Sequence, residues 1–242
     1  MNKKVLIISA SPRKGGNSET LAAAFAKGVQ AAGNQVETVY LREKQIGFCK
    51  GCFACLKLGH CVIQDDAVEI AAKMHNANVL VFATPVYYYC VSGQLKTMLD
   101  RANPLFDTDY AFTKAYLLAT AAEDEPETFA GTEKAMQGWV DCFPRCALVG
   151  TVFAGGVNGV GEIAGHPALE QAYITYVGWR QQWKCFDSNG FPDGTSASVF
   201  QADDYNPADP EYRVRYWDKE GNYTDTMVKV NDIDPQNASY GI

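Results

Sequence analysis

The sequence lacks long apolar runs, and it lacks an excess of basic residues. It contains no stretch of eighteen uninterrupted apolar residues, so a membrane-spanning helix is not expected. The formal net charge of -7 and the pI near 5.0 leave no basic footprint for nucleic acid or an anionic membrane. The first residues also lack the apolar core and cleavage site of a secretory signal. We therefore expect a soluble cytoplasmic protein.

A disulfide framework is not expected either, although the chain has eight cysteines. In the cytoplasm, cysteines serve more often as thiols, metal ligands or redox centres. With 242 residues, 47% of them apolar, the chain is long enough for one main domain and an appendage.

Two common phosphate-binding patterns are also missing. There is no Gly-x-x-x-x-Gly-Lys-Ser/Thr motif of nucleoside triphosphatases and no Gly-x-Gly-x-x-Gly motif of dinucleotide sites. Instead, Ser9-Ala-Ser-Pro-Arg-Lys-Gly-Gly-Asn-Ser-Glu-Thr20 connects an apolar run to a helical pattern. Its hydroxyl and amide donors, its arginine and its glycines predict a phosphate monoester, such as that of FMN, at a helix start. The alternative is a turn that only caps the helix.

Strand-like and helix-like segments alternate along most of the chain. Strands are expected at residues 5–8, 35–40, 79–83, 115–120 and 147–153, and helices at 18–32, 66–74, 93–102, 125–143 and 166–182. This alternation predicts an α/β fold with a doubly wound five-stranded parallel sheet, with ligands bound beyond the carboxyl ends of the strands.

The composition changes near residue 185, where Asp, Gly, Pro and Tyr become frequent. Segments 213–217 and 223–230 alternate around a glycine turn and predict a β-hairpin. We therefore expect a domain at 1–184 and a C-terminal extension at 185–242 that packs on the domain or on a partner subunit.

A second loop, Thr84-Pro-Val-Tyr-Tyr-Tyr-Cys-Val-Ser-Gly93, follows the third predicted strand. Pro85, Val86 and Tyr87 offer an apolar face to a planar ring such as isoalloxazine, and backbone amides at 87–89 are available to its carbonyls. The alternative is that the three tyrosines are ordinary packing at a domain edge.

Together the two loops resemble those of the NADPH-dependent FMN reductase family, whose members are flavodoxin-like. The resemblance rests on Ser-Pro-Arg-x-x-Gly-Asn-Ser at 11–18 and on Pro-Val-Tyr…Gly-x-Leu-Lys-x-x-x-Asp-Arg at 85–101, and it extends over about residues 3 to 180. It implies FMN as cofactor, NAD(P)H as electron donor and a homodimer or homotetramer. The implied FMN contacts are Ser9, Ser11, Arg13, Asn17 and Ser18 at the phosphate, Pro85, Val86, Tyr87 and Tyr88 at the ring and ribityl chain, and Thr120, Ala121 and Ala122 as a third wall.

Four further cysteines form the pattern Cys49-x2-Cys52-x2-Cys55-x5-Cys61. Two-residue gaps let successive thiolates converge on one small object, and three cysteines in such a row are typical of a [4Fe-4S] cluster. The pattern resembles the compact motif of iron-sulfur flavoproteins, a branch of the same family. The alternatives are buried thiols that shape the loop, or zinc on the four sulfurs, with His60 at the surface.

The first functional hypothesis is an FMN-dependent oxidoreductase that takes hydride from NAD(P)H and passes electrons to a flavin, a quinone or another small acceptor. The second is an iron-sulfur flavoprotein electron carrier linked to ferredoxin, and the third is a redox-responsive binding protein. No catalytic side chain is expected. His166 is expected to cap a helix or pack, and the glycines at 155–165 suggest a mobile loop near the site.

Overall fold

The computed structural model describes residues 2–177, 181–183, 196–201, 211–217 and 223–229. The chain divides into two compact units, Met1–Tyr173 and Ile174–Ile242. The sequence places a domain boundary after residue 184, and that boundary stays a prediction.

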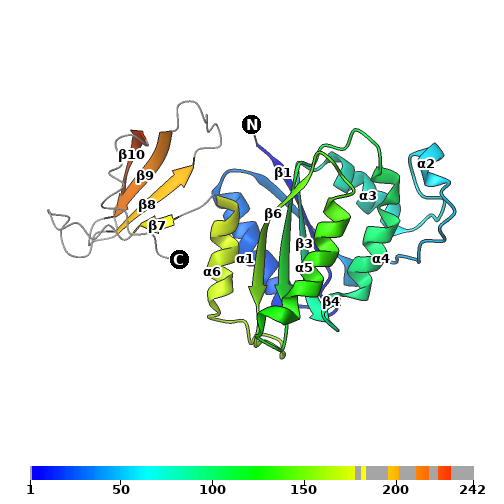
Figure 1. Ribbon diagram of the computed structural model, residues 1–242, viewed down its shortest axis with the longest axis horizontal. Coiled ribbons are helices and arrows are strands. Elements are labelled where there is room, and N and C mark those ends of the chain that lie inside the picture. The colour runs from blue at the N-terminus through cyan, green and yellow to red at the C-terminus, as the bar shows by residue number, and fades with distance from the viewer. Residues whose placement is uncertain (1, 178–180, 184–195, 202–210, 218–222, 230–242) are drawn as a thin grey trace. The chain divides into compact units, whose positions relative to one another are not determined.

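The first unit is built on a parallel sheet (Figure 1). Its parallel strands are β1 (Lys4–Ser9), β2 (Gln35–Tyr40), β3 (Val79–Tyr87), β5 (Lys114–Thr120) and β6 (Ala147–Ala154). The strand order is β2-β1-β3-β5-β6, and every pairing along it is parallel. The short strand β4 (Cys90–Val91) adds an antiparallel pair to the end of β3. This is the flavodoxin-like order, which reverses between β1 and β3, and the predicted doubly wound sheet is confirmed.

Helices cover both faces of this sheet. They are α1 (Asn17–Ala31), α3 (Asp66–Asn76), α4 (Gly93–Arg101), α5 (Pro126–Val140) and α6 (Pro167–Val177), with short turns α2 (Cys55–Leu58), η1 (Leu41–Glu43) and η2 (Asn103–Leu105). In Figure 1, α1 and α6 lie on one side of the sheet and α3, α4 and α5 on the other. Among the described residues, no helix has the length and apolar character needed to cross a membrane.

The central strands are apolar on both faces because both faces are covered. Ile7 and Ile8 are neighbours on β1 that point to opposite sides, and both are fully buried. Ile8 belongs to the core shared with α3, α4 and α5. On the face of α1, Phe25 packs on Tyr116 with ring centroids 5.1 Å apart. The core thus fixes the carboxyl edge of the sheet, where the loops begin.

The second unit contains an antiparallel sheet in the order β10-β9-β8-β7. Its strands are β7 (Gln181–Trp183), β8 (Ser196–Gln201), β9 (Glu211–Trp217) and β10 (Tyr223–Lys229). The pairing of β9 with β10 confirms the predicted hairpin. Strand β8 is rich in small polar residues and was not predicted. The sequence predicts helix through Gln182, but α6 ends at Val177 and Gln182 lies in β7.

Candidate functional site

The loop between β1 and α1 buries several polar side chains. Ser9 ends β1, is fully buried, and its Oγ has no hydrogen-bond partner. Ser11, Asn17 and Ser18 are also buried. Buried hydroxyls in proteins nearly always have a hydrogen-bond partner. The unpaired Ser9 hydroxyl therefore indicates that a bound ligand supplies its acceptor. The structure brings these predicted phosphate contacts together at one strand-to-helix turn.

The start of α1 is open to an anion. Its N-cap is Gly16, which has no side chain to accept from the first-turn amides. A Cβ at Gly16 would lie 2.5 Å from Ser11 Oγ and 3.1 Å from Arg13 O, so a larger residue would fill the loop. Gly15 has φ 66°, in the left-handed region. Uncapped amides and the helix dipole together make an anion site.

Two predicted phosphate contacts bind the glycine-rich segment after β6. The exposed Arg13 donates from Nη1 to Asn158 O at 2.8 Å. Asn17 donates from Nδ2 to Gly159 O at 2.9 Å and accepts from Ile163 N at 3.4 Å. The segment at 155–165 therefore lies against the phosphate loop. Sequence reasoning placed this segment near the site but missed the bonds, because backbone carbonyl acceptors have no residue signature.

A charged pair supports the same loop from behind. Glu19 Oε2 accepts from Gly15 N at 3.1 Å and from Arg42 Nη1 at 2.6 Å. The Arg42 guanidinium lies over the Tyr40 ring at 4.6 Å. Arg42 thus offsets a negative charge next to a site for an anion. Sequence reasoning missed this pair, whose partners are 23 positions apart.

The predicted flavin loop is a tight hairpin. Strands β3 and β4 pair Val86 with Val91 and Tyr87 with Cys90, which leaves Tyr88 and Tyr89 as the turn. Both turn residues have positive φ, 49° and 60°. Asn-Gly is the usual choice for such a turn, and strained backbone of this kind gathers at functional sites. Tyr88 is fully exposed and its side chain is available to a ligand or partner.

The third predicted wall lies beside this hairpin. Thr120 ends β5 and is in register with Pro85 of β3 and with Ala154 of β6. Thr120 and Ala121 are buried, whereas Ala122 is exposed. The carboxyl ends of β1, β3 and β5 therefore bring the three predicted groups to one edge of the sheet.

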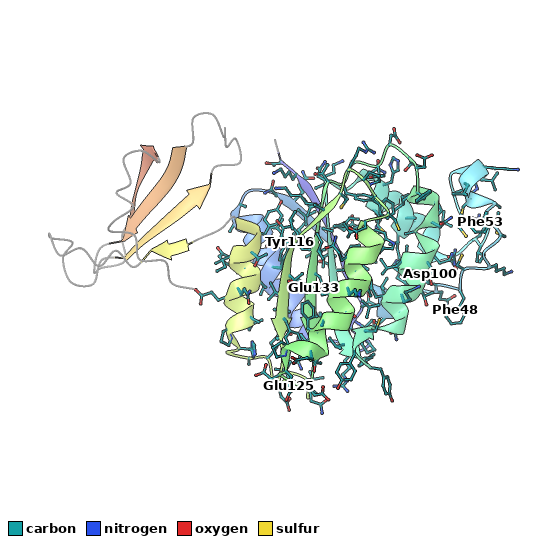
Figure 2. The ribbon with its side chains drawn as sticks, viewed as in Figure 1. Phe48, Phe53, Asp100, Tyr116, Glu125 and Glu133 are labelled. Atoms are coloured by element: carbon teal, nitrogen blue, oxygen red, sulfur yellow. The ribbon has the colours of Figure 1, made fainter. Side chains whose placement is uncertain are left out.

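Glu123 extends that wall and was missed by sequence reasoning. Its Oε2 accepts from Tyr89 Oη at 3.2 Å and from Thr128 Oγ1 at 2.8 Å. The hydrogen bond to Glu123, followed by the charge of that carboxylate, raises the pKa of Tyr89. The phenol thus stays protonated. Figure 2 shows Glu125, two residues further on, at the carboxyl edge of the sheet.

The cysteine segment, residues 47–63, lies between η1 and α3. Cys49 and Cys52 are exposed, and Cys55 and Cys61 are partly exposed, so they are not buried thiols. No group of three His, Cys, Asp or Glu side chains in the described part of the chain is close enough to hold a metal ion. The donor set nevertheless suits an iron-sulfur cluster, since it offers four thiols on one short segment.

Backbone and side-chain N–H groups already point at these sulfurs. Gly51 N donates to Cys49 Sγ at 3.4 Å, and Asn103 Nδ2 donates to Cys55 Sγ at 3.1 Å. Gly51 and Phe53 have positive φ, 63° and 54°, and turn the chain between the cysteines. N–H groups directed at sulfur are typical surroundings of cluster ligands.

One buried arginine holds both ends of the cysteine segment. Arg101 ends α4 and is 1% exposed. Its Nη1 donates to Gly47 O and its Nη2 donates to Ile63 O, at 2.7 and 3.0 Å. The same guanidinium forms a bidentate pair with Asp65, at 2.7 and 2.8 Å. Arg101 is the last residue of the second sequence motif, which by itself predicts no role for it.

Asp65 is the second half of this clamp. Burial raises the pKa of its carboxyl, but the hydrogen bond from Arg101 and those from the amides of Gly47 and Ala67 outweigh it, so the pKa lies below the usual value. Asp65 also caps α3 by accepting from Ala67 N at 3.1 Å. The two ends of the cysteine segment are therefore joined to the core by an ion pair and hydrogen bonds.

The rest of the cysteine segment is apolar and exposed. Its exposed large side chains are Phe48, Phe53, Leu56, Leu58 and Val62. Figure 2 shows Phe48 and Phe53 at the margin of the first unit. Exposed apolar side chains that gather on one segment are typical of interaction surfaces.

The remaining candidates have structural roles or none. His166 Nδ1 accepts from Ala168 N at 3.1 Å at the start of α6, so the predicted helix cap is confirmed. His60 is exposed, as expected. Burial raises the pKa of Cys146 to about 11. Cys185 lies outside the described residues.

Comparisons with known proteins agree with this geometry. The sequence model of the NADPH-dependent FMN reductase family matches residues 3–156. An iron-sulfur flavoprotein of Methanosarcina thermophila is 32% identical over 167 residues, which are 69% of this chain and 85% of that protein. An iron-sulfur flavoprotein of Archaeoglobus fulgidus is 39% identical over 101 residues, 42% of this chain and 46% of that protein.

Solved structures share the fold. An NAD(P)H:quinone oxidoreductase from Methanothermobacter marburgensis aligns with TM-score 0.58 and 19% identity over 73% of this chain and 96% of that one. An azoreductase from Bacillus anthracis aligns with TM-score 0.55 and 18% identity over 73% and 99%. In sequence, the chain spans about half the length of the first curated relatives it matches. The two motif blocks, the strand order and the match over residues 3–156 make this chain a member of the NADPH-dependent FMN reductase family.

Proposed function

We propose that this chain binds FMN and is an oxidoreductase that accepts hydride from NAD(P)H and passes electrons to a small acceptor such as a flavin or a quinone. The observation that carries the proposal is the unpaired, buried Ser9 hydroxyl beside the uncapped start of α1, at the point where the strand order reverses. Family membership supports the same cofactor.

Each wall of the site has a separate task. Ser9, Ser11, Ser18 and the first amides of α1 hold the phosphate. The β3–β4 hairpin lines the ring through Pro85, Val86 and Tyr87, and residues 120–122 close the other side. Bound FMN supplies the capacity to take a hydride and release electrons. The chain's own residues anchor and orient it, and Tyr89 is held by Glu123 as a neutral hydroxyl.

A titration with FMN, followed by anaerobic reduction, tests this proposal. We expect the purified protein to be yellow or to quench FMN fluorescence on binding, and NADPH or NADH to bleach the bound flavin rapidly. Protein that shows no affinity for FMN would overturn the proposal. Binding of FMN without reduction by either nicotinamide would retain the cofactor and overturn the hydride donor.

A second candidate function is that of an iron-sulfur flavoprotein electron carrier linked to ferredoxin. We propose Cys49, Cys52, Cys55 and Cys61 as ligands of a [4Fe-4S] cluster. The N–H groups aimed at Cys49 and Cys55 favour it, as does the clamped base of the segment. The names of the relatives from Methanosarcina and Archaeoglobus point the same way.

Anaerobic purification with iron and sulfide analysis tests the second candidate. We expect about four irons per chain, and loss of that iron in Cys52→Ser with FMN affinity unchanged within about twofold. Bleaching by NADPH supports the enzyme, whereas bleaching that needs reduced ferredoxin supports the carrier. Zinc in place of iron would contradict the cluster.

We propose a homodimer or homotetramer in the cytoplasm, with no nucleic-acid or membrane partner. The exposed apolar side chains of the cysteine segment and the exposed Tyr88 support an assembly. Light scattering of the purified chain at several concentrations measures its mass, and a concentration-independent monomer would contradict the assembly.

A further inference from the structure

Arg101 is a buried cation whose hydrogen-bonding capacity is not fully used. Its side chain has 0% exposure, and four of its N–H groups meet Gly47 O, Ile63 O and the two Asp65 oxygens. The fifth, on Nε, has no hydrogen-bond partner. A buried unpaired donor of this kind is costly. The side chain therefore retains one buried donor that is unused in the described structure.

A candidate acceptor is the sulfur of Cys61, which belongs to the segment whose two ends Arg101 holds. Cys61 is also two residues from Ile63, whose carbonyl Arg101 already binds.

Asn103, close to Arg101 in the sequence, also carries a side-chain donor that meets the cysteine segment. It follows α4 by two residues and donates to Cys55 Sγ at 3.1 Å. The end of α4 and η2 thus place two side chains with N–H donors against the cysteine segment, Asn103 on Cys55 and Arg101 on Gly47 and Ile63. Both donors come from the scaffold rather than from the cysteine segment itself.

We propose that Arg101 is a positioning residue for the iron-sulfur cluster: it fixes the two ends of the cysteine segment and donates its free Nε–H to the sulfur of Cys61. This inference rests on the proposed cluster at Cys49, Cys52, Cys55 and Cys61. Hydrogen bonds to ligand sulfurs and nearby positive charge raise the reduction potential of a cluster. Arg101 therefore governs both loading of the cluster and its potential.

A lysine keeps the charge and one bond to Asp65 but cannot reach two carbonyls and a sulfur at once. The test compares wild type, Arg101→Lys, Arg101→Met and a control, Lys96→Met. Lys96 lies on the exposed side of the same helix, paired with Asp100 at 2.6 Å. Each protein is purified anaerobically with FMN, and iron, sulfide, circular dichroism and the cluster midpoint potential are measured.

We expect Arg101→Lys to fold and carry a cluster that is about tenfold harder to reduce, a shift of about −59 mV for one electron. Arg101→Met is expected to lose more than half of its iron, and Lys96→Met to match wild type. A loaded Arg101→Lys protein with wild-type iron content and potential would overturn the role of Arg101 and leave the cluster intact. Wild type without iron would overturn the cluster itself, whatever the FMN content. If Arg101→Met fails to fold, the lysine variant decides.

Discussion

The phosphate loop and the cysteine segment follow neighbouring strands, yet they are built in opposite ways. The phosphate loop buries Ser9, Ser11 and Asn17. The cysteine segment exposes Cys49, Cys52 and several large apolar side chains, and it is fastened mainly at its base by Arg101 and Asp65. The polar side chains of the phosphate loop are buried, whereas the cysteine segment is exposed and is held mainly at its two ends.

This difference indicates how each site meets its ligand. Donors fixed by the core need little rearrangement to bind an anion, so the phosphate loop is preorganised. The four thiols are not gathered in the described structure and need the ligand itself to bring them together. Substitutions that fill the phosphate loop and substitutions that remove the contacts at the ends of the cysteine segment should therefore have separate effects.

Removal of the Asp65 charge, which pairs with Arg101, should have the largest effect. Asp65→Asn leaves the buried Arg101 without its counter-ion, so we expect a loss of about 3 kcal/mol in the free energy of unfolding at pH 7. Urea unfolding measures it. Asp66→Asn is the matched control, because Asp66 is part exposed and pairs with Lys44 at 3.6 Å. Equal losses in the two variants would contradict a clamp.

The same pair gives a pH dependence. Although burial opposes them, the hydrogen bond from Arg101 and those from two backbone amides hold the pKa of Asp65 in the folded chain below the ordinary value of an aspartate. The stabilisation is therefore complete above the unfolded pKa and disappears as the pH falls through the folded one. Wild type should lose this share of its stability in acid below about pH 4, whereas Asp65→Asn should lack it.

Filling the phosphate loop should come next. Gly16→Ala places a Cβ 2.5 Å from Ser11 Oγ, where the phosphate must approach. We expect FMN affinity to fall about 100-fold, equal to about 2.7 kcal/mol, by fluorescence titration. In the control Gly138→Ala, nothing lies within 4 Å of the added Cβ, and affinity should be unchanged. A change of less than threefold in Gly16→Ala would place the phosphate elsewhere.

The unpaired hydroxyl of Ser9 offers a finer test. Ser9→Ala should weaken FMN binding about tenfold while leaving the free protein equally or more stable, because the hydroxyl is unsatisfied without ligand. Thr132 Oγ1 is also buried and unpaired, but it lies on α5. Thr132→Val should share the effect on stability and spare FMN. Equal FMN affinities in the two variants would show that Ser9 is not a ligand contact.

A substitution in the turn of the β3–β4 hairpin should give the smallest effect. Replacing Tyr88 by Asn and Tyr89 by Gly relieves two positive φ angles, so we expect the free energy of unfolding to rise by about 1 kcal/mol. Thermal unfolding without FMN measures it. A fall in stability would mean that the Tyr89–Glu123 hydrogen bond outweighs the strain.

The sequence contained most of the scaffold because local patterns determine it. Strand β2 begins and ends where predicted, and the boundaries of α4 differ from the prediction by one residue. The Ser9–Thr20 loop was recognised because strand, glycines and helix are contiguous. Strand β3 was predicted to end at Ala83, but it continues to Tyr87 because its last residues pair with β5 and β4.

The features that escaped prediction depend on long-range contacts. Arg101 meets partners 36, 38 and 54 positions away, and Arg13 meets a carbonyl 145 positions away. Carbonyl acceptors are present at every residue, so no local pattern identifies the ones used. Positive φ at Tyr88 likewise depends on the register of β3 with β4.

Helix α4 begins at the flavin hairpin and ends at the clamp. Its N-cap Ser92 accepts from Leu95 N at 3.4 Å and donates its own amide to Thr84 Oγ1 at 3.0 Å, while Arg101 closes the far end. Nine residues of α-helix make a strut of about 13 Å. The spacing between the two loops of one chain is therefore set by the rigid geometry of a helix. Inserting or deleting a helical residue would rotate one loop relative to the other by about 100°, so neither loop can drift alone.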